Sequence, residues 1–81
     1  MARMDNLIKS LEWNKRIEVL RITNGWTQSE AADKCGTSPK VYWLWEKGLS
    51  SPRNNSRIAI AKAFEVSVEE IFGEQANNKA G

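Results

Sequence analysis

Apolar residues recur at helical spacing along most of the chain, and turn residues separate one periodic segment from the next. Trp13, Ile17 and Leu20 fall on one helical stripe, which stops at Asn24-Gly25, a good signal for the end of a helix. No segment alternates with the two-residue period of a β-strand. The pattern therefore predicts an all-α chain whose first helix begins near Trp13.

Two short helices joined by a tight turn are expected within residues 27–48. Thr27, with a glutamate three residues later, forms a capping box that begins the first of them. Gly36 provides a residue that tolerates left-handed backbone, and Ser38-Pro39 is a typical helix start. The spacing predicts a helix-turn-helix over about residues 27–47.

The side chains of these two helices suit close packing. Ala31 and Ala32 are small enough to let the second helix approach the first, while Tyr42 and Trp45 give the second helix a face to bury. Cys35 lies on the apolar side of the first helix and is expected in the core. Such a hinge occurs mainly in proteins that place the second helix in the major groove of DNA.

A fourth and a fifth helix are expected after a loop that contains Pro52, which disfavours helix at the residue before it. Asn54 or Asn55 can cap the fourth helix, whose buried face is expected to carry Ile58, Ala61 and Phe64. A second capping box at Ser67 opens a short fifth helix that ends at Gly73. The expected organisation is an N-terminal arm (1–10), one helix-turn-helix domain (11–73) and a frayed polar tail (74–81).

The composition excludes several classes of function. With 81 residues, no histidine and one cysteine, the chain offers no internal disulfide and no ordinary zinc spacing. A glycine-rich phosphate loop is missing, and no serine or cysteine has an evident base partner. We therefore expect neither an enzyme nor a metal, cofactor or small-molecule site. No apolar run approaches the ~20 residues that span a bilayer, so the protein is expected to be cytoplasmic, with no membrane partner.

Charge is distributed unevenly, although the net charge is only +2. Residues 34–57 contain five basic side chains and a single acid, Glu46, whereas residues 65–74 contain four acids and no base. The half of the domain that includes the hinge can therefore face a polyanion while the C-terminal end faces away from it.

The motifs of the chain, taken together, resemble those of one family. The domain from Trp13 to Gly73 is similar to the Cro/repressor-type (Xre-like) helix-turn-helix DNA-binding domains of bacterial and phage regulators, including the lambda-type phage repressors. The residues that carry this resemblance are Arg21, Gly25-Trp26-Thr27-Gln28, Ala32-Asp33-Lys34-Cys35-Gly36, Ser38, Trp45-Glu46-Lys47-Gly48, Pro52, Ala61-Lys62-Ala63-Phe64-Glu65-Val66-Ser67 and Ile71-Phe72.

The resemblance implies a compact five-helix, lambda-repressor-like domain and a function. A member of this family would be a sequence-specific regulator of transcription that binds double-stranded DNA, expected here to be a repressor of a bacterium, phage or mobile element. Its third helix, about residues 39–47, would enter the major groove. Because one small domain makes few base contacts, a homodimer on a pseudo-palindromic operator is expected, with a dimer surface near the fifth helix.

The resemblance also implies roles for individual residues. Arg21 and Glu46 occupy positions that pair as a salt bridge between the first and third helices. Candidate DNA phosphate contacts are Gln28, Lys47 and Arg53. Candidate DNA base contacts, on the outward face of the third helix, are Pro39, Lys40, Trp43 and Leu44. For each basic side chain, a solvated surface charge remains the alternative interpretation.

Trp43 and Leu44 depart from the family pattern, in which polar side chains commonly stand at these positions. They offer almost no hydrogen-bonding groups to base edges, so they would contact thymine methyl groups and sugar edges instead. The alternative is an exposed apolar face that binds a protein, as in an antitoxin or adaptor built on the same fold.

Overall fold

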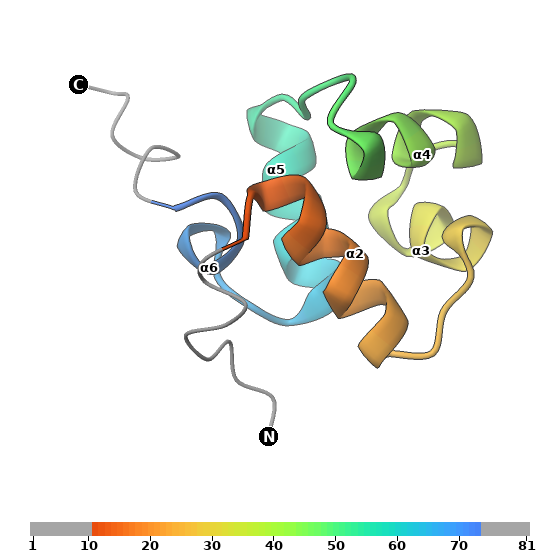
Figure 1. Ribbon diagram of the computed structural model, residues 1–81, viewed down its shortest axis with the longest axis horizontal. Coiled ribbons are helices and arrows are strands. Elements are labelled where there is room, and N and C mark those ends of the chain that lie inside the picture. Colours follow the sequence, from red (N-terminus) through yellow and green to blue (C-terminus); the bar gives the residue numbers. More distant parts are fainter. Residues whose placement is uncertain (1–10, 74–81) are drawn as a thin grey trace.

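The computed structural model describes residues 11–73, and within this range the chain forms five α-helices and no strand (Figure 1). The helices, in chain order, are α2 (Trp13–Thr23), α3 (Gln28–Cys35), α4 (Pro39–Lys47), α5 (Asn54–Phe64) and α6 (Val68–Phe72). The expected all-α fold is confirmed. The expected arm (1–10) and tail (74–81) lie outside the described residues.

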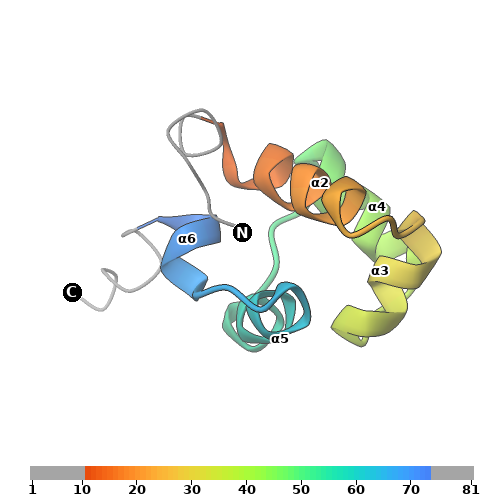
Figure 2. The ribbon, with the colours of Figure 1, turned by 90° about the horizontal axis from the view of Figure 1, so that it is seen from below.

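The helices pack as a small bundle in which α3 and α4 lie together at one end and α6 lies at the other (Figures 1 and 2). In Figure 2, α2 and α4 lie on one side and α5 on the opposite side. The most extensive helix contacts are those of α3 with α4 and α5, of α2 with α4 and α6, and of α5 with α6. Because α4 is held by both α2 and α3, its inner face is fixed while its outer face is left to solvent.

Local side-chain chemistry begins and ends the two central helices as expected. The Thr27 hydroxyl accepts a hydrogen bond from the Glu30 backbone N–H at 3.0 Å, and the Glu30 carboxylate accepts one from the Thr27 N–H at 2.8 Å. This capping box begins α3, and Gly36, with φ of 75°, ends it in the left-handed region. Ser38 caps α4, where its hydroxyl accepts from the N–H of Val41 at 3.2 Å.

The core is built from one or more residues of every helix. Its largest fully buried side chains are Ile17 of α2, Tyr42 of α4, Ile60 of α5 and Ile71 of α6. The other buried residues of this core cluster are Ala31, Ala32, Cys35, Trp45, Ala61 and Phe64. Both alanines of α3 are fully buried, which confirms that small side chains are needed where α3 packs against its neighbours.

Two expectations for α5 are wrong. Ile58 is 49% exposed, and Ile60 is buried in its place beside Ala61 and Phe64. At about 100° per residue, Ile58 points about 160° away from Ile60 and about 120° away from Phe64, so the three residues cannot share one face. Nor does an asparagine cap this helix, because the N-cap residue is Arg53, which makes no side-chain capping bond.

The short helix α6 is anchored by aromatic and cationic side chains. The Phe72 ring lies 5.7 Å from the Trp13 ring and 5.2 Å from the Arg57 guanidinium. Arg16 donates hydrogen bonds to the backbone carbonyls of Glu70 and Ile71, both at 3.1 Å. Arg57, one of the five basic residues of the stretch 34–57, is therefore engaged with α6 and is half-buried.

Candidate nucleic-acid interface

The outward face of α4 presents a short row of side chains to solvent. Pro39 and Lys40 in the first turn and Lys47 in the last are exposed, and Trp43 between them is 38% exposed. Leu44 is half-buried beside them. These positions recur at spacings of three and four residues, so they share one side of the helix. The four candidate base-contacting residues are thus brought together.

The opposite face of α4 fixes how the helix is oriented. Tyr42 and Trp45 are buried, and their rings meet edge to face with centroids 6.0 Å apart. Val41 is half-buried and packs against the core as well. Since this face cannot leave the core without exposing two large rings, the outward row is held in one direction.

Glu46 also points inward and is the one charged side chain of the buried core among the described residues. Its carboxylate accepts hydrogen bonds from Arg21 Nε at 2.6 Å, from Arg21 Nη2 at 3.3 Å and from Gln28 Nε2 at 3.0 Å. Arg21 Nη1 also donates to the Trp26 carbonyl at 3.0 Å. Arg21 and Glu46 therefore form an ion pair that joins α2, α3 and α4 through one carboxylate.

The environment of Glu46 keeps it ionised. Burial on its own raises the pKa of this carboxyl, but the hydrogen bond from Arg21, the nearby Tyr42 hydroxyl and the Gln28 amide outweigh burial and hold the pKa below its usual range. The Tyr42 hydroxyl faces this carboxylate without meeting the geometry of a hydrogen bond. In turn, the Glu46 hydrogen bond raises the pKa of Arg21.

Pairing Glu46 with Arg21 changes the charge that α4 presents. Glu46 is the single acid of residues 34–57, and it is 3% exposed. The exposed charges of this stretch are therefore all basic: Lys34, Lys40, Lys47 and Arg53. The stretch from the end of α3 through α4 to the connection before α5 thus presents only basic charges to solvent, and this set of side chains is called the basic surface below.

Gln28 is placed differently from the simplest expectation for a phosphate contact. Its side-chain amide is half-buried and donates one N–H to Glu46. The second amide N–H and its own backbone N–H, at the start of α3, are the donors that Gln28 can still offer outward. The sequence shows only that Gln28 stands at the start of a helix, so it did not predict this contact with Glu46.

Asn14 also supports α4, although the sequence analysis did not predict this role. Its side-chain amide donates to the backbone carbonyl of Glu46 at 3.1 Å, close to where α4 ends at Gly48. A Cβ atom at Gly48 would lie 3.2 Å from the same amide nitrogen. Asn14 thus holds the C-terminal end of α4 against α2, and no sequence pattern singles it out.

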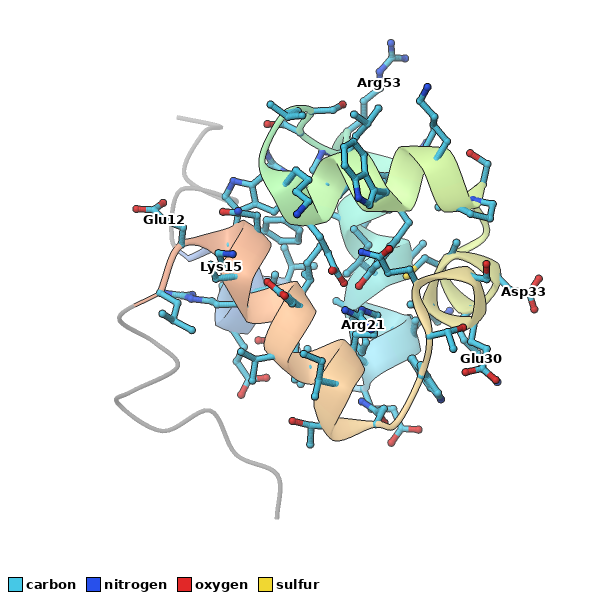
Figure 3. All side chains as sticks on the ribbon, turned by 45° about the vertical axis from the view of Figure 1, so that its right-hand side comes forward. Glu12, Lys15, Arg21, Glu30, Asp33 and Arg53 are labelled. Carbon is cyan, nitrogen blue, oxygen red and sulfur yellow. The ribbon has the colours of Figure 1, made fainter. Side chains whose placement is uncertain are left out.

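Arg53 lies in the connection between α4 and α5 and projects from the body of the molecule, as Figure 3 shows. The labelled acids Glu30 and Asp33 project from α3 in a different direction, and Arg21 lies inward between the helices (Figure 3). Arg53 therefore extends the basic surface beyond α4.

Two lysines of this surface lie over indole rings. The ammonium nitrogen of Lys47 is 5.7 Å from the centre of the Trp43 ring, and that of Lys34 is 5.5 Å from the Trp26 ring. Both distances are within the range of a cation–π interaction. Trp26 also stacks on Phe64, with ring centroids 5.5 Å apart, whereas the group that lies over the Trp43 ring is the Lys47 ammonium.

Within residues 11–73, no cluster of three or more histidine, cysteine, aspartate or glutamate side chains is placed to hold a metal ion. The same residues include no helix long and apolar enough to cross a membrane.

Comparison with known proteins agrees with this geometry. A helix-turn-helix family model matches residues 17–71. The solved structure of the P22 c2 repressor protein, in complex with synthetic operator 9T in the presence of Tl⁺, is similar in fold, with a TM-score of 0.74 and 22% sequence identity. The similarity covers 78% of this chain and 97% of that chain. No curated protein sequence gives a significant match. Because the family match spans more than half of the chain, this protein belongs to the Cro/C1-type helix-turn-helix family of DNA-binding transcription regulators.

Proposed function

We propose that this protein is a repressor that binds double-stranded DNA sequence-specifically in the cytoplasm and inserts α4 into the major groove. The observation that carries the proposal is the stretch of residues 34–57, which includes α4: its exposed charges are all basic, and its single acid is buried against Arg21. An α-helix fits the width of the major groove, and a basic surface compensates the charge of the flanking phosphates.

Lys40 is proposed as the main polar reader of base edges. It is exposed in the first turn of α4, next to Pro39, and the ends of helices that enter the groove first commonly contact bases. A lysine ammonium can donate to the O6 and N7 acceptors of guanine. Trp43 and Leu44 follow on the same face and would add apolar contacts.

Phosphate contacts are assigned to Gln28, which precedes α4 in the chain, to Lys47, the last residue of α4, and to Arg53, which follows it. Gln28 begins α3, where free backbone N–H groups and the helix dipole favour an anion. Lys47 ends α4 and Arg53 follows in the next connection, and both are exposed. These contacts would fix the register of the domain on the duplex without reading its sequence.

A homodimer on a pseudo-palindromic operator is part of the proposal. One α4 helix reads only a few base pairs, and two-fold symmetry doubles the number of contacts. The centres of the two half-sites would then lie about one DNA turn, roughly 34 Å, apart. The P22 c2 repressor was solved in complex with an operator, which supports this kind of partner.

Selection of binding sites from random double-stranded DNA tests the proposal, followed by titration of the selected site at several salt concentrations. We expect an enriched sequence with two related halves, and an affinity whose logarithm falls by several units per tenfold rise in salt. Lys40→Ala should relax the base preference at one position, whereas Lys62→Ala, at an exposed position of α5, should change nothing. Failure to enrich any sequence would reject sequence-specific binding.

A further inference from the structure

Three of the four tryptophans lie in the core or pack against it, and Trp43 is the fourth. Trp45 is buried, Trp13 pairs with Phe72 and Trp26 stacks on Phe64. Trp43 instead stands at the centre of the outward row of α4, with 38% of its surface exposed. Its exposed surface, together with that of half-buried Leu44 next to it, is therefore available to a partner that meets the outward row of α4.

Lys47 lies one helical turn after Trp43, and its ammonium group lies over the Trp43 ring. The ammonium nitrogen is 5.7 Å from the ring centroid, and the spacing of four residues stacks the two side chains on the same side of α4. A cation is attracted to the face of an indole ring, so this contact favours one orientation of the Trp43 ring before any partner arrives.

The chemistry of indole restricts what an oriented Trp43 can recognise in a major groove. The ring has one N–H donor and no acceptor, so it cannot make the paired hydrogen bonds by which polar side chains read guanine or adenine. Its large apolar surface matches the one apolar group on that edge of the natural bases, the C5-methyl group of thymine. Half-buried Leu44, next in sequence, enlarges the apolar surface.

We propose that Trp43 reads a 5-methylpyrimidine in the major groove and that Lys47 is a positioning residue that orients the Trp43 ring. The inference rests on the proposed function, because it requires α4 to lie in the groove. Thymine and 5-methylcytosine carry the same methyl group, and either would satisfy the ring. Lys47 thereby contributes to specificity as well as to phosphate binding.

The methyl group can be removed without any other change to the base by replacing thymine with deoxyuridine. In the selected operator, each thymine is replaced in turn and binding is measured by fluorescence anisotropy. Burial of one methyl group corresponds to about a fourfold change in affinity. We expect a loss of about that size at one thymine of each half-site for the unaltered protein. Equal affinity for every substituted operator would overturn the inference.

Protein variants assign the effect to the two residues. In Trp43→Ala, the deoxyuridine penalty at that position should disappear, and because Trp43 is exposed the variant should keep its circular dichroism spectrum. Lys47→Gln should lower the affinity and also reduce the penalty. Arg53→Gln, the matched control, should lower the affinity and leave the penalty unchanged. An unchanged penalty in Lys47→Gln would overturn the positioning role.

A third experiment distinguishes thymine from 5-methylcytosine as the base that Trp43 contacts. Its outcomes also separate a failure of this inference from a failure of the proposed function. Where the sensitive thymine is replaced by cytosine opposite guanine, methylation of that cytosine at C5 should restore about fourfold in affinity for the unaltered protein and not for Trp43→Ala. No restoration would limit the recognised base to thymine and overturn the wider 5-methylpyrimidine class. Enrichment of an operator without any methyl dependence would reject the inference alone, whereas no enrichment at all would reject the proposed function.

Discussion

Arg21 Nε lies 2.6 Å from Glu46 Oε2, and this ion pair crosses from α2 to the last turn of α4. The two side chains are 15% and 3% exposed, so the pair is shielded from water on most sides. Removing two charges from water offsets much of their attraction, which makes the net contribution of such a pair to stability small. Its clear consequence is geometric, because it fixes the end of the proposed reading helix relative to the rest of the domain.

Replacing only one partner of the pair should be costly. Arg21→Met leaves the buried Glu46 carboxylate with the Gln28 amide as its remaining close donor, and we expect a loss of about 3 kcal/mol in the free energy of unfolding. Urea denaturation followed by tryptophan fluorescence measures it. The control is Lys15→Met, which breaks the exposed Lys15–Glu18 pair at 3.3 Å and should cost under about 0.5 kcal/mol. Equal costs for the two variants would contradict the structural role of the buried pair.

The same pair should make stability depend on pH in the acidic range. The pKa of Glu46 is lowered in the folded protein, so its contribution is present above the unfolded-state pKa, about 4.3, and is lost as the pH falls below it. Unfolding of the unaltered protein and of Glu46→Gln should be compared between pH 7 and pH 2. We expect the stability difference between them to shrink as the pH falls through about 4. A difference that stayed constant over this range would show that Glu46 does not titrate as an ion-paired carboxylate.

Gly36 and Gly48 both end helices with positive φ, but an alanine should cost more at one than at the other. At Gly36 a Cβ atom meets nothing within 4 Å, so Gly36→Ala should cost only the left-handed strain, about 1–2 kcal/mol. At Gly48 the new Cβ would lie 3.2 Å from the Asn14 amide nitrogen, so this amide would have to shift slightly and its hydrogen bond to the Glu46 carbonyl would weaken. Gly48→Ala should therefore cost about 1 kcal/mol more than Gly36→Ala, as measured by urea denaturation.

A double-mutant cycle isolates that contact. In an Asn14→Ala background the amide is already gone, and Gly48→Ala should then cost no more than Gly36→Ala does. If the extra cost of Gly48→Ala persisted without Asn14, the contact between the two residues would not be its cause.

Local signals in the sequence were sufficient to predict the helices of this domain. The capping residues Thr27 and Ser67 and the turn residue Gly36 act within a few residues of themselves, so their effects are visible in the chain. The inward direction of α5 was not visible, because Ile58 and Ile60 are equally apolar and the packing partners decide between them. Tertiary context overrides such local patterns.

The candidate site likewise has features that the sequence predicts and others that it does not. The outward row of α4 follows from helical phase and from the burial of Tyr42 and Trp45, both of which the spacing indicates. The donation from Gln28 to Glu46 and the support from Asn14 connect residues that are 18 and 32 positions apart. Contacts at such separations depend on the path of the whole chain and carry no local signature.

Glu65 adopts the left-handed conformation at the end of α5, with φ of 58°, and it is the non-glycine residue of the described range with positive φ. A side chain there costs about 1 kcal/mol relative to glycine. Glu65→Gly should therefore stabilise the domain by roughly 0.5–1 kcal/mol, measured as a rise in Tm. The matched control is Lys62→Gly, which places glycine inside the same helix at an exposed position and should destabilise by about 1 kcal/mol. Destabilisation by both would show that Glu65 is not strained.

Cys35, the single cysteine of the chain, is buried on α3, and burial raises the pKa of its thiol to about 11. At pH 8 it should therefore be both protonated and shielded, and the thiolate is the reactive form. We expect an aromatic disulfide reagent to react only with molecules in which the domain has opened, and to react at once in about 8 M urea. When reclosing is fast, the rate follows the unfolding equilibrium constant, so Arg21→Met should raise it more than about a hundredfold for a loss of about 3 kcal/mol. Reaction of the unaltered protein at the rate of an exposed thiol would contradict the packing of Cys35 between α3 and its neighbours.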